Sequence, residues 1–254
     1  AFDSLIAYVE RNGNFINSPQ VPAMITAYEL YPLLDSNILI IDTRTTEEFA
    51  SAHIPSSFNL PFEHLLNYFE GKIDPNSFSH IVLVCNAGQT ASYATSILRI
   101  LGYNNVFALK WGFSSWHRET AEKRWLARTS NKYSELLEQN PNLKKPAGGF
   151  PGIETEQVFG YGILRERAHL LFSQGFNPIT VTPDTLFHPD NGFYIINYWP
   201  EALYNKGHIP GAIRYQPKKS LKSSEQLNTL PIDRPVVVYC FTGQHSSFAT
   251  AYLR

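Results

Sequence analysis

The two cysteines are the residues of this chain best placed to do chemistry. Cys85 and Cys240 each lie at a hinge between an expected strand and an expected helix. In both cases an apolar run precedes the cysteine, and a polar loop with a glycine three positions on follows it: Ile81–Val84 and Gly88, Val236–Tyr239 and Gly243. Open parallel sheets hold their ligands at the carboxyl ends of central strands. The position therefore points to a reactive thiol.

The start of the following helix would give such a thiol a particular electrostatic environment. The first amide groups of a helix have no partner within it, and the helix dipole favours negative charge there. This setting is able to lower a thiol pKa from about 8.5 to between about 3.5 and 7.5. The pattern predicts a nucleophilic thiolate among backbone N–H groups. A small buried apolar cysteine is the alternative, but the hinge occurs twice.

Other uses of the cysteines fit the sequence less well. No Cys-x-x-Cys motif occurs, so no four-ligand zinc site is expected. A Cys85–Cys240 disulfide is disfavoured, since disulfide scaffolds are short and rich in cysteine. A cysteine–histidine hydrolase would need a histidine oriented beside the thiol. We expect His53 and His208 to stabilise turns instead.

An internal repeat organises the chain. Cys85 and Cys240 are 155 positions apart (240 − 85), and two further motifs recur with the same offset. They are Ile-Asp-Thr-Arg at 41–44 with Ile-Asn-Tyr-Trp at 196–199, and His-Ile-Pro at 53–55 and 208–210. Separated motifs that share one offset indicate two copies of one fold.

Each copy alternates strands with helices. In the first copy we expect a short helix capped by Thr45 or Thr46, and a helix that Gly71 ends in a left-handed conformation. The expected strands are 38–42, 57–60, 81–84 and 106–110, and the longer helices are 62–69, 90–101 and 114–124. This alternation predicts an α/β protein with two repeated domains, each a parallel sheet of about five strands with helices on both faces.

The repeat also sets the expected domain boundaries. They are an N-terminal helical extension at 1–20, a first domain at 21–127, a linker at 128–180 with one helix at 163–172, and a second domain at 181–254. Arg254 aligns with Arg99, so the second copy lacks counterparts of residues 100 to about 118. We expect its C-terminal strand and helix to be missing or replaced, because a sheet cut there exposes a strand edge.

Composition excludes several classes. Hydrophobic residues make up 43% and charged residues 17%, as in ordinary globular proteins. A net charge of −1 without a Lys/Arg-rich run argues against a protein that binds nucleic acid. No apolar run approaches the roughly 20 residues that span a bilayer, so we expect a soluble protein, cytoplasmic or periplasmic. The start at Ala1 leaves a removed leader open.

These motifs together resemble the rhodanese family, specifically its tandem-domain sulfurtransferases. The resemblance covers about residues 20–120 and 180–254. It is carried by Ile-Asp-Thr-Arg, the His-Ile-Pro turns, the six-residue loops that start at the cysteines, and Trp111-Gly112 followed by Trp116. Each motif is weak alone, but their order and spacing are specific.

The resemblance implies sulfur transfer through a cysteine persulfide. Cys85 or Cys240 would take sulfane sulfur from thiosulfate, 3-mercaptopyruvate or a persulfide and pass it to a thiol or to cyanide. No metal or organic cofactor is implied, and a homodimer is left open. The implied substrate-binding loops are Asn86, Ala87, Gly88, Gln89, Thr90 and Ala91, and Phe241, Thr242, Gly243, Gln244, His245 and Ser246. The alternative is a rhodanese-like binding, regulatory or sulfur-carrier module without efficient turnover.

The two copies differ at a charged pair that, in the family, braces the active loop. Asp42 and Arg44 form this pair in the first copy, whereas the second has Asn-Tyr-Trp there. The intact pair favours Cys85 as the primary site. Tandem members usually keep the working cysteine in the second domain, so Cys240 stays a candidate.

The loops also bear on the substrate. Thiosulfate-preferring members usually carry a basic residue in the loop, but here only His245 could aid anion binding. The Cys-Gly-Ser-Gly-Val-Thr pattern of the mercaptopyruvate branch is not matched either, so the donor stays open. Related phosphatases and arsenate reductases use Cys-x5-Arg, whereas the sixth residue after the cysteine is Ala91 or Ser246. Without an arginine fork, little would stabilise a phosphoryl group.

Overall fold

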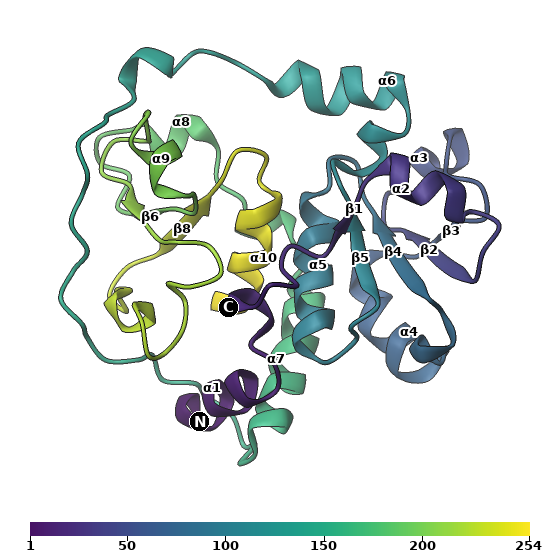
Figure 1. Ribbon diagram of the computed structural model, residues 1–254, viewed down its shortest axis with the longest axis horizontal. Helices are drawn as coiled ribbons and strands as arrows, with labels where there is room; N and C mark the ends of the chain where they lie inside the picture. Colours follow the sequence, from purple (N-terminus) through teal and green to yellow (C-terminus); the bar gives the residue numbers. More distant parts are fainter. The chain divides into compact units, whose positions relative to one another are not determined.

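The computed structural model describes residues 1–254 (Figure 1). The chain forms two compact units, each built around one parallel sheet. The five-stranded unit consists of Pro22–Thr129, Arg165–Pro178 and Ser247–Arg254. The three-stranded unit consists of Ala1–Val21, Ser130–Leu164 and Ile179–Ser246. The expected α/β class with two repeated domains is confirmed.

The strands of the five-stranded unit come from the apolar runs of the sequence, and all neighbouring pairs are parallel. Their spatial order is β1 (Met24–Ile25), β5 (Val106–Leu109), β4 (His80–Val84), β2 (Ile38–Asp42), β3 (Phe58–Asn59). Successive side chains of a strand point to opposite faces of its sheet. Because Val82 and Leu83 on the central strand β4 are both fully buried, other parts of the unit cover both faces.

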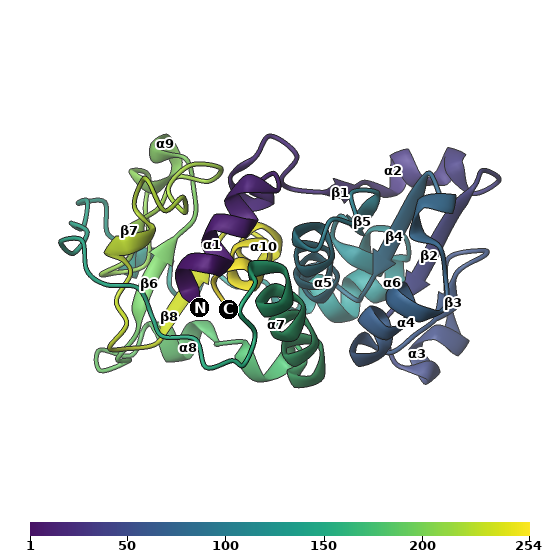
Figure 2. The same ribbon diagram turned by 90° about the horizontal axis from the view of Figure 1, so that it is seen from below.

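Helices connect these strands: α2 (Ala27–Leu30), α3 (Thr46–Ser51), α4 (Leu65–Gly71) and α5 (Gln89–Ile100). Thr45 caps α3 in a capping box with Glu48. Gly102 follows α5 with a φ of 105°. Gly71 differs from the expectation, because it is the last residue inside α4 and its φ is not positive. Figure 2 shows α5 beside β4 and β5, against which it packs.

The closing segment of this unit is not the single helix expected at 114–124. His117 has an extended backbone, with φ −127° and ψ 117°, and interrupts it. Four short helical turns result: the 3-10 turn η5 (Gly112–Ser115), α6 (Arg118–Thr120), the π-helical turn η6 (Ala121–Trp125) and the 3-10 turn η7 (Leu126–Arg128). Tertiary contacts of η5, described below, outweigh the helical pattern here.

The three-stranded unit repeats the middle of this arrangement. Its strands β7 (Ile213–Arg214), β6 (Tyr194–Asn197) and β8 (Val236–Tyr239), in that spatial order, are the counterparts of β3, β2 and β4. α10 (Gln244–Leu253) follows β8 as α5 follows β4. This sheet has no counterpart of β5. β8 is half-buried along its length, whereas β4 is buried from Ile81 on.

The remaining helices are α1 (Phe2–Arg11), α7 (Gly160–Gln174), α8 (Pro183–Leu186) and α9 (Glu201–Tyr204). α7 contains the helix expected at 163–172 and ends before Gly175, whose φ is 73°. None of the helices is both long and apolar enough to cross a membrane.

Candidate active site

The Cys85 loop (residues 85–90) lies between the end of β4 and the start of α5. The Cys85 Sγ accepts hydrogen bonds from the backbone N–H groups of Gly88, at 3.2 Å, and Ala91, at 3.3 Å. Gly88 is the N-cap of α5 and has a φ of 88°, a conformation that glycine adopts freely. The sulfur thus faces the backbone donors at a helix N-terminus.

Burial opposes ionisation of this sulfur. Cys85 is only 6% exposed, and burial raises the pKa of its thiol above the ordinary value. The backbone N–H groups of Ala91, Gly88, Ala87 and Thr90 lower the pKa in turn without compensating fully. The expectation of a lowered thiol pKa is therefore wrong for Cys85. The expected donors are present, but the loop and its neighbours exclude the water that would solvate a thiolate.

Gly112 allows the turn η5 to approach the Cys85 loop closely. A Cβ atom on Gly112 would lie 2.2 Å from the carbonyl oxygen of Cys85 and 2.6 Å from the backbone nitrogen of Gly88. The φ of Gly112 is also positive, at 60°. Only glycine satisfies both conditions without strain.

The residues after Gly112 hold the carbonyl groups of the loop. The Phe113 N–H donates to the Cys85 carbonyl at 2.7 Å. Ser114 donates to the Asn86 carbonyl from its N–H, at 3.0 Å, and from its hydroxyl, at 2.8 Å. The turn η5 therefore fixes the backbone that aims the loop amides at the sulfur.

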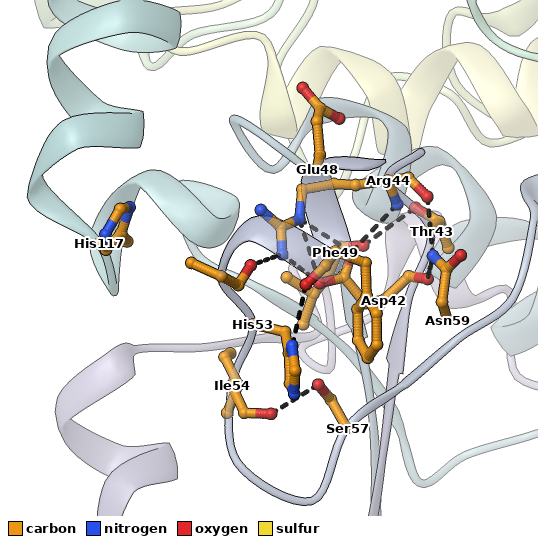
Figure 3. Close-up of polar contacts among 12 residues, drawn as sticks. Asp42, Thr43, Arg44, Glu48, Phe49, His53, Ile54, Ser57, Asn59 and His117 are labelled. Carbon is orange, nitrogen blue, oxygen red and sulfur yellow. Dashed lines mark hydrogen bonds and ion pairs between the residues drawn. The ribbon is translucent and has the colours of Figure 1, made fainter. Parts of the chain in front are cut away.

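The predicted pair Asp42 and Arg44 forms a buried, bidentate ion pair (Figure 3). Arg44 Nε lies 2.9 Å from Asp42 Oδ1, and Arg44 Nη2 lies 2.6 Å from Asp42 Oδ2. The guanidinium also donates to the Ala52 carbonyl at 2.8 Å and lies 3.7 Å from the centre of the Phe113 ring. The pair therefore supports the Cys85 loop through Phe113, whose N–H bonds to it.

Glu48 lies next to the Cys85 loop, where its side chain contacts Asn86. Figure 3 shows its carboxylate pointing away from Asp42 and Arg44. Both of its oxygens accept from the Asn86 Nδ2, at 3.1 Å, and Oε1 also contacts Arg124 Nη2. Burial tends to raise the pKa of Glu48, but the Asn86 hydrogen bond and the Arg124 charge lower it overall.

The histidines of the two His-Ile-Pro turns serve the turns, as predicted. His53 stacks on Phe49 with ring centres 4.1 Å apart, and its Nδ1 lies 2.9 Å from the Phe49 carbonyl oxygen (Figure 3). His208 makes the equivalent contacts with Tyr204, at 3.7 Å and 2.9 Å. Both rings are thus tied to the preceding helical turn.

The Cys240 loop (residues 240–245) has the same backbone course in the three-stranded unit. The Cys240 Sγ accepts the N–H of Ser246 at 3.3 Å, and the Ser246 hydroxyl lies 3.5 Å from it. Gly243 has a φ of 78°, close to that of Gly88. Cys240 is half-buried, more open than Cys85, and both cysteines are free thiols.

An aromatic cluster replaces the ion pair in the second copy. Trp199 stacks on Phe241 with ring centres 4.1 Å apart. Asn197 donates from Nδ2 to the Tyr239 hydroxyl at 2.8 Å. Aromatic side chains therefore lie at the Cys240 loop, whereas the charged Glu48 lies at the Cys85 loop.

The sequence pattern of the Rhodanese-like domain matches the chain twice, at residues 26–119 and 189–254. The chain belongs to the rhodanese-like family. Each of its two rhodanese-like domains contains one of the cysteine loops, so the internal repeat is a repeat of this domain.

Individual relatives match part of the chain. The thiosulfate sulfurtransferase GlpE of Shewanella oneidensis is 34% identical over 85 residues, which cover 34% of this chain and 81% of that protein. Protein HIGH ARSENIC CONTENT 1, mitochondrial, of Arabidopsis thaliana is 30% identical over 103 residues, or 36% of this chain and 60% of that protein. The solved structure of the human single-domain sulfurtransferase TSTD1 is 26% identical with a TM-score of 0.31, covering 42% of this chain and 98% of that one.

Sequence reasoning found the cysteines, their loops and the Asp42–Arg44 pair of this rhodanese-like chain, but it missed two partners of the Cys85 loop. Ser114 gave no signal beyond following Trp111-Gly112. Nothing in the local sequence indicates the contact of Glu48 with Arg124, because it joins distant parts of the sequence. The residues six positions after the cysteines, Ala91 and Ser246, each donate a backbone N–H to the sulfur.

Proposed function

We propose that this protein is a sulfurtransferase that carries sulfane sulfur on Cys85. The observation that supports the proposal best is the position of the Cys85 Sγ, which accepts two backbone N–H groups where α5 begins. Donors placed this way stabilise negative charge on sulfur. Membership of the rhodanese-like family and the named thiosulfate sulfurtransferase among the relatives support the same activity.

The proposed reaction has two displacement steps. The Cys85 thiol first gives its proton to solvent, and its thiolate then attacks the sulfane sulfur of thiosulfate. The sulfur–sulfur bond of thiosulfate breaks, sulfite leaves with the electron pair, and Cys85 becomes a persulfide whose terminal sulfur is anionic. In the second step an acceptor thiolate attacks that terminal sulfur, becomes a persulfide and releases the Cys85 thiolate. Neither step uses a metal or an organic cofactor.

The residues of the two loops are the proposed donor site. In the first domain, the N–H groups of residues 86–91 would surround the terminal sulfur of the persulfide. In the second domain, Cys240 is a secondary candidate for the same chemistry, with His245 beside it in the loop. 3-Mercaptopyruvate or a persulfide could replace thiosulfate as the donor.

A second function, a sulfur carrier or binding module without efficient turnover, is favoured by one observation. Burial raises the pKa of the Cys85 thiol, so only a small fraction is a thiolate at neutral pH. A slow nucleophile that holds its persulfide in a closed loop would store sulfur rather than pass it on rapidly.

Intact mass measurement tests the proposal. The protein is incubated with thiosulfate, 3-mercaptopyruvate or a polysulfide, and a gain of one sulfur atom is sought in wild type, Cys85→Ser and Cys240→Ser. We expect the gain in wild type and Cys240→Ser, and its loss in Cys85→Ser. A gain that persists in Cys85→Ser and disappears in Cys240→Ser would move the reaction to the second domain. No gain with any donor would contradict sulfur transfer. Loss of the added sulfur to cyanide or a thiol separates turnover from storage.

A further inference from the structure

The Cys85 loop contains no charged side chain, but a charged pair lies at its edge. Asn86, Ala87, Gln89 and Thr90 are neutral. Glu48 accepts hydrogen bonds from the Asn86 side chain and from Arg124 through the same oxygen, Oε1. The Arg124 guanidinium therefore lies next to the side chain that directly follows Cys85.

Arg124 differs from the other basic residues of its helical segment. Arg118 pairs with Glu122 and Lys123 with Glu119, both within the segment at i,i+4 spacing. Arg124 instead reaches across to Glu48, on α3. Arg124 lies in the π-helical turn η6. Such turns are rare in proteins, but those that occur are often found at functional sites. The fold thus directs this one cation toward the Cys85 loop.

The guanidinium keeps donors available for a ligand. Its contact with Glu48 uses Nη2 alone, and its side chain is 44% exposed. A guanidinium has five N–H donors in a planar fork, which suits bidentate binding of an oxyanion. The Glu48 carboxylate, 22% exposed, holds the guanidinium through this one nitrogen.

We propose that Arg124 is a specificity-determining residue of the Cys85 site, which binds the anionic group of the incoming sulfur donor while Glu48 holds it in position. The inference rests on the proposed function for its substrate, but the anion preference is measurable without sulfur transfer. Arg124 thus supplies the positive charge that the side chains of the Cys85 loop lack. The substrate class is a small donor that carries an oxyanion next to its sulfane sulfur.

Paired alkylating reagents test the anion preference directly. Iodoacetate is anionic and iodoacetamide is neutral, and both alkylate the same thiolate. Their rates are measured on the full chain in a Cys240→Ser background, so that Cys85 is the thiol observed. We expect Arg124→Gln to slow iodoacetate by about tenfold, as for a lost hydrogen bond to a charged group, and to change the iodoacetamide rate less than twofold. Arg118→Gln, on the same segment and 92% exposed, is the matched control and should change neither rate.

Thiosulfate loading of the same variants gives the second measurement. We expect Arg124→Gln to slow the gain of one sulfur from thiosulfate by about the same factor as iodoacetate, and Arg124→Lys to recover part of the rate. Added salt should slow the anionic reagents in wild type more than in Arg124→Gln. If the ratio of iodoacetate to iodoacetamide rates is unchanged in Arg124→Gln, the inference is overturned. If that ratio falls but wild type takes no sulfur from any donor, the anion site stands and the proposed function fails.

Discussion

At the scale of single residues, two opposing effects set the reactivity of Cys85. Four backbone N–H groups favour the thiolate, and burial disfavours it more strongly, so the pKa of the thiol is raised. The folded protein then keeps the thiol proton to a higher pH than the unfolded chain does. By linkage, Cys85 contributes its full stabilisation below about pH 8.5, the ordinary thiol pKa, and loses it as pH rises toward the folded pKa.

We therefore expect the reaction of Cys85 with iodoacetamide to accelerate with pH and to reach its midpoint above that of a free thiol, about 8.5. Urea denaturation should also show that raising the pH from 7 to 10 destabilises wild type more than Cys85→Ala. The Cys240→Ser background isolates Cys85 in the kinetic measurement. A midpoint below 8.5 would mean that the loop amides outweigh burial, contrary to the balance described here.

Gly112 offers a test of how tightly η5 packs on the Cys85 loop. Gly112→Ala would place a Cβ 2.2 Å from the Cys85 carbonyl oxygen at a positive φ, so we expect a loss of about 2 kcal/mol or more in the free energy of unfolding. Gly71→Ala is the matched control in the same unit, because no atom lies within 4 Å of its added Cβ. Its helical position predicts an effect between zero and a gain of about 1 kcal/mol. Equal urea midpoints for the two variants would contradict the close packing.

At the scale of elements, the sequence predicted what depends on local pattern. β2 and β4 were readable because a buried parallel strand needs an uninterrupted β-branched run. α3 was readable from Thr45, a residue type that caps helices. The conformation of the segment after Trp111 was not readable from the sequence, because the hydrogen bonds of η5 to the Cys85 loop depend on the assembled fold. Long-range contacts therefore set the conformation of this segment, and the segment supports the candidate site.

The ion pair between Asp42 and Arg44 links β2 to the Cys85 loop, and it predicts non-additive substitutions. Asp42→Asn or Arg44→Met alone should cost about 3–5 kcal/mol, because each leaves a buried partner unpaired. The double variant should cost less than the sum of the two. Arg165→Met removes the half-exposed Arg165–Glu70 pair of the same unit and should cost only about 0–1 kcal/mol. Urea unfolding of wild type, the two single variants and the double variant measures the cycle, and strictly additive costs would contradict a coupled pair.

At the scale of the whole molecule, the two copies keep the same His-Ile-Pro turn but surround it differently. His53 is exposed, whereas His208 is fully buried. Glu138, from the segment expected to be a linker, forms an antiparallel bridge with His208 through N–H···O bonds of 3.0 and 2.9 Å. Its Oε1 accepts the Gly211 N–H at 2.7 Å. The repeat was readable from the constant offset between its motifs. The contacts of Glu138 were not readable, because the first copy has no equivalent segment.

The Glu138 contacts predict that this side chain contributes to holding the irregular segment against the sheet of the three-stranded unit. Glu138→Ala removes the acceptor of the Gly211 N–H, a loss of about 1–3 kcal/mol for a group left unsatisfied. The segment should then open more often, so trypsin should cleave after Lys144 several-fold faster, because cleavage follows the population of the open form. Glu135→Ala, an exposed neighbour, is the control and should leave the cleavage rate unchanged. Iodoacetamide should alkylate Cys85 at the same rate in both variants, since Glu138 belongs to the other unit. Equal cleavage of Glu138→Ala and Glu135→Ala would contradict a role of the Glu138 side chain in holding the segment.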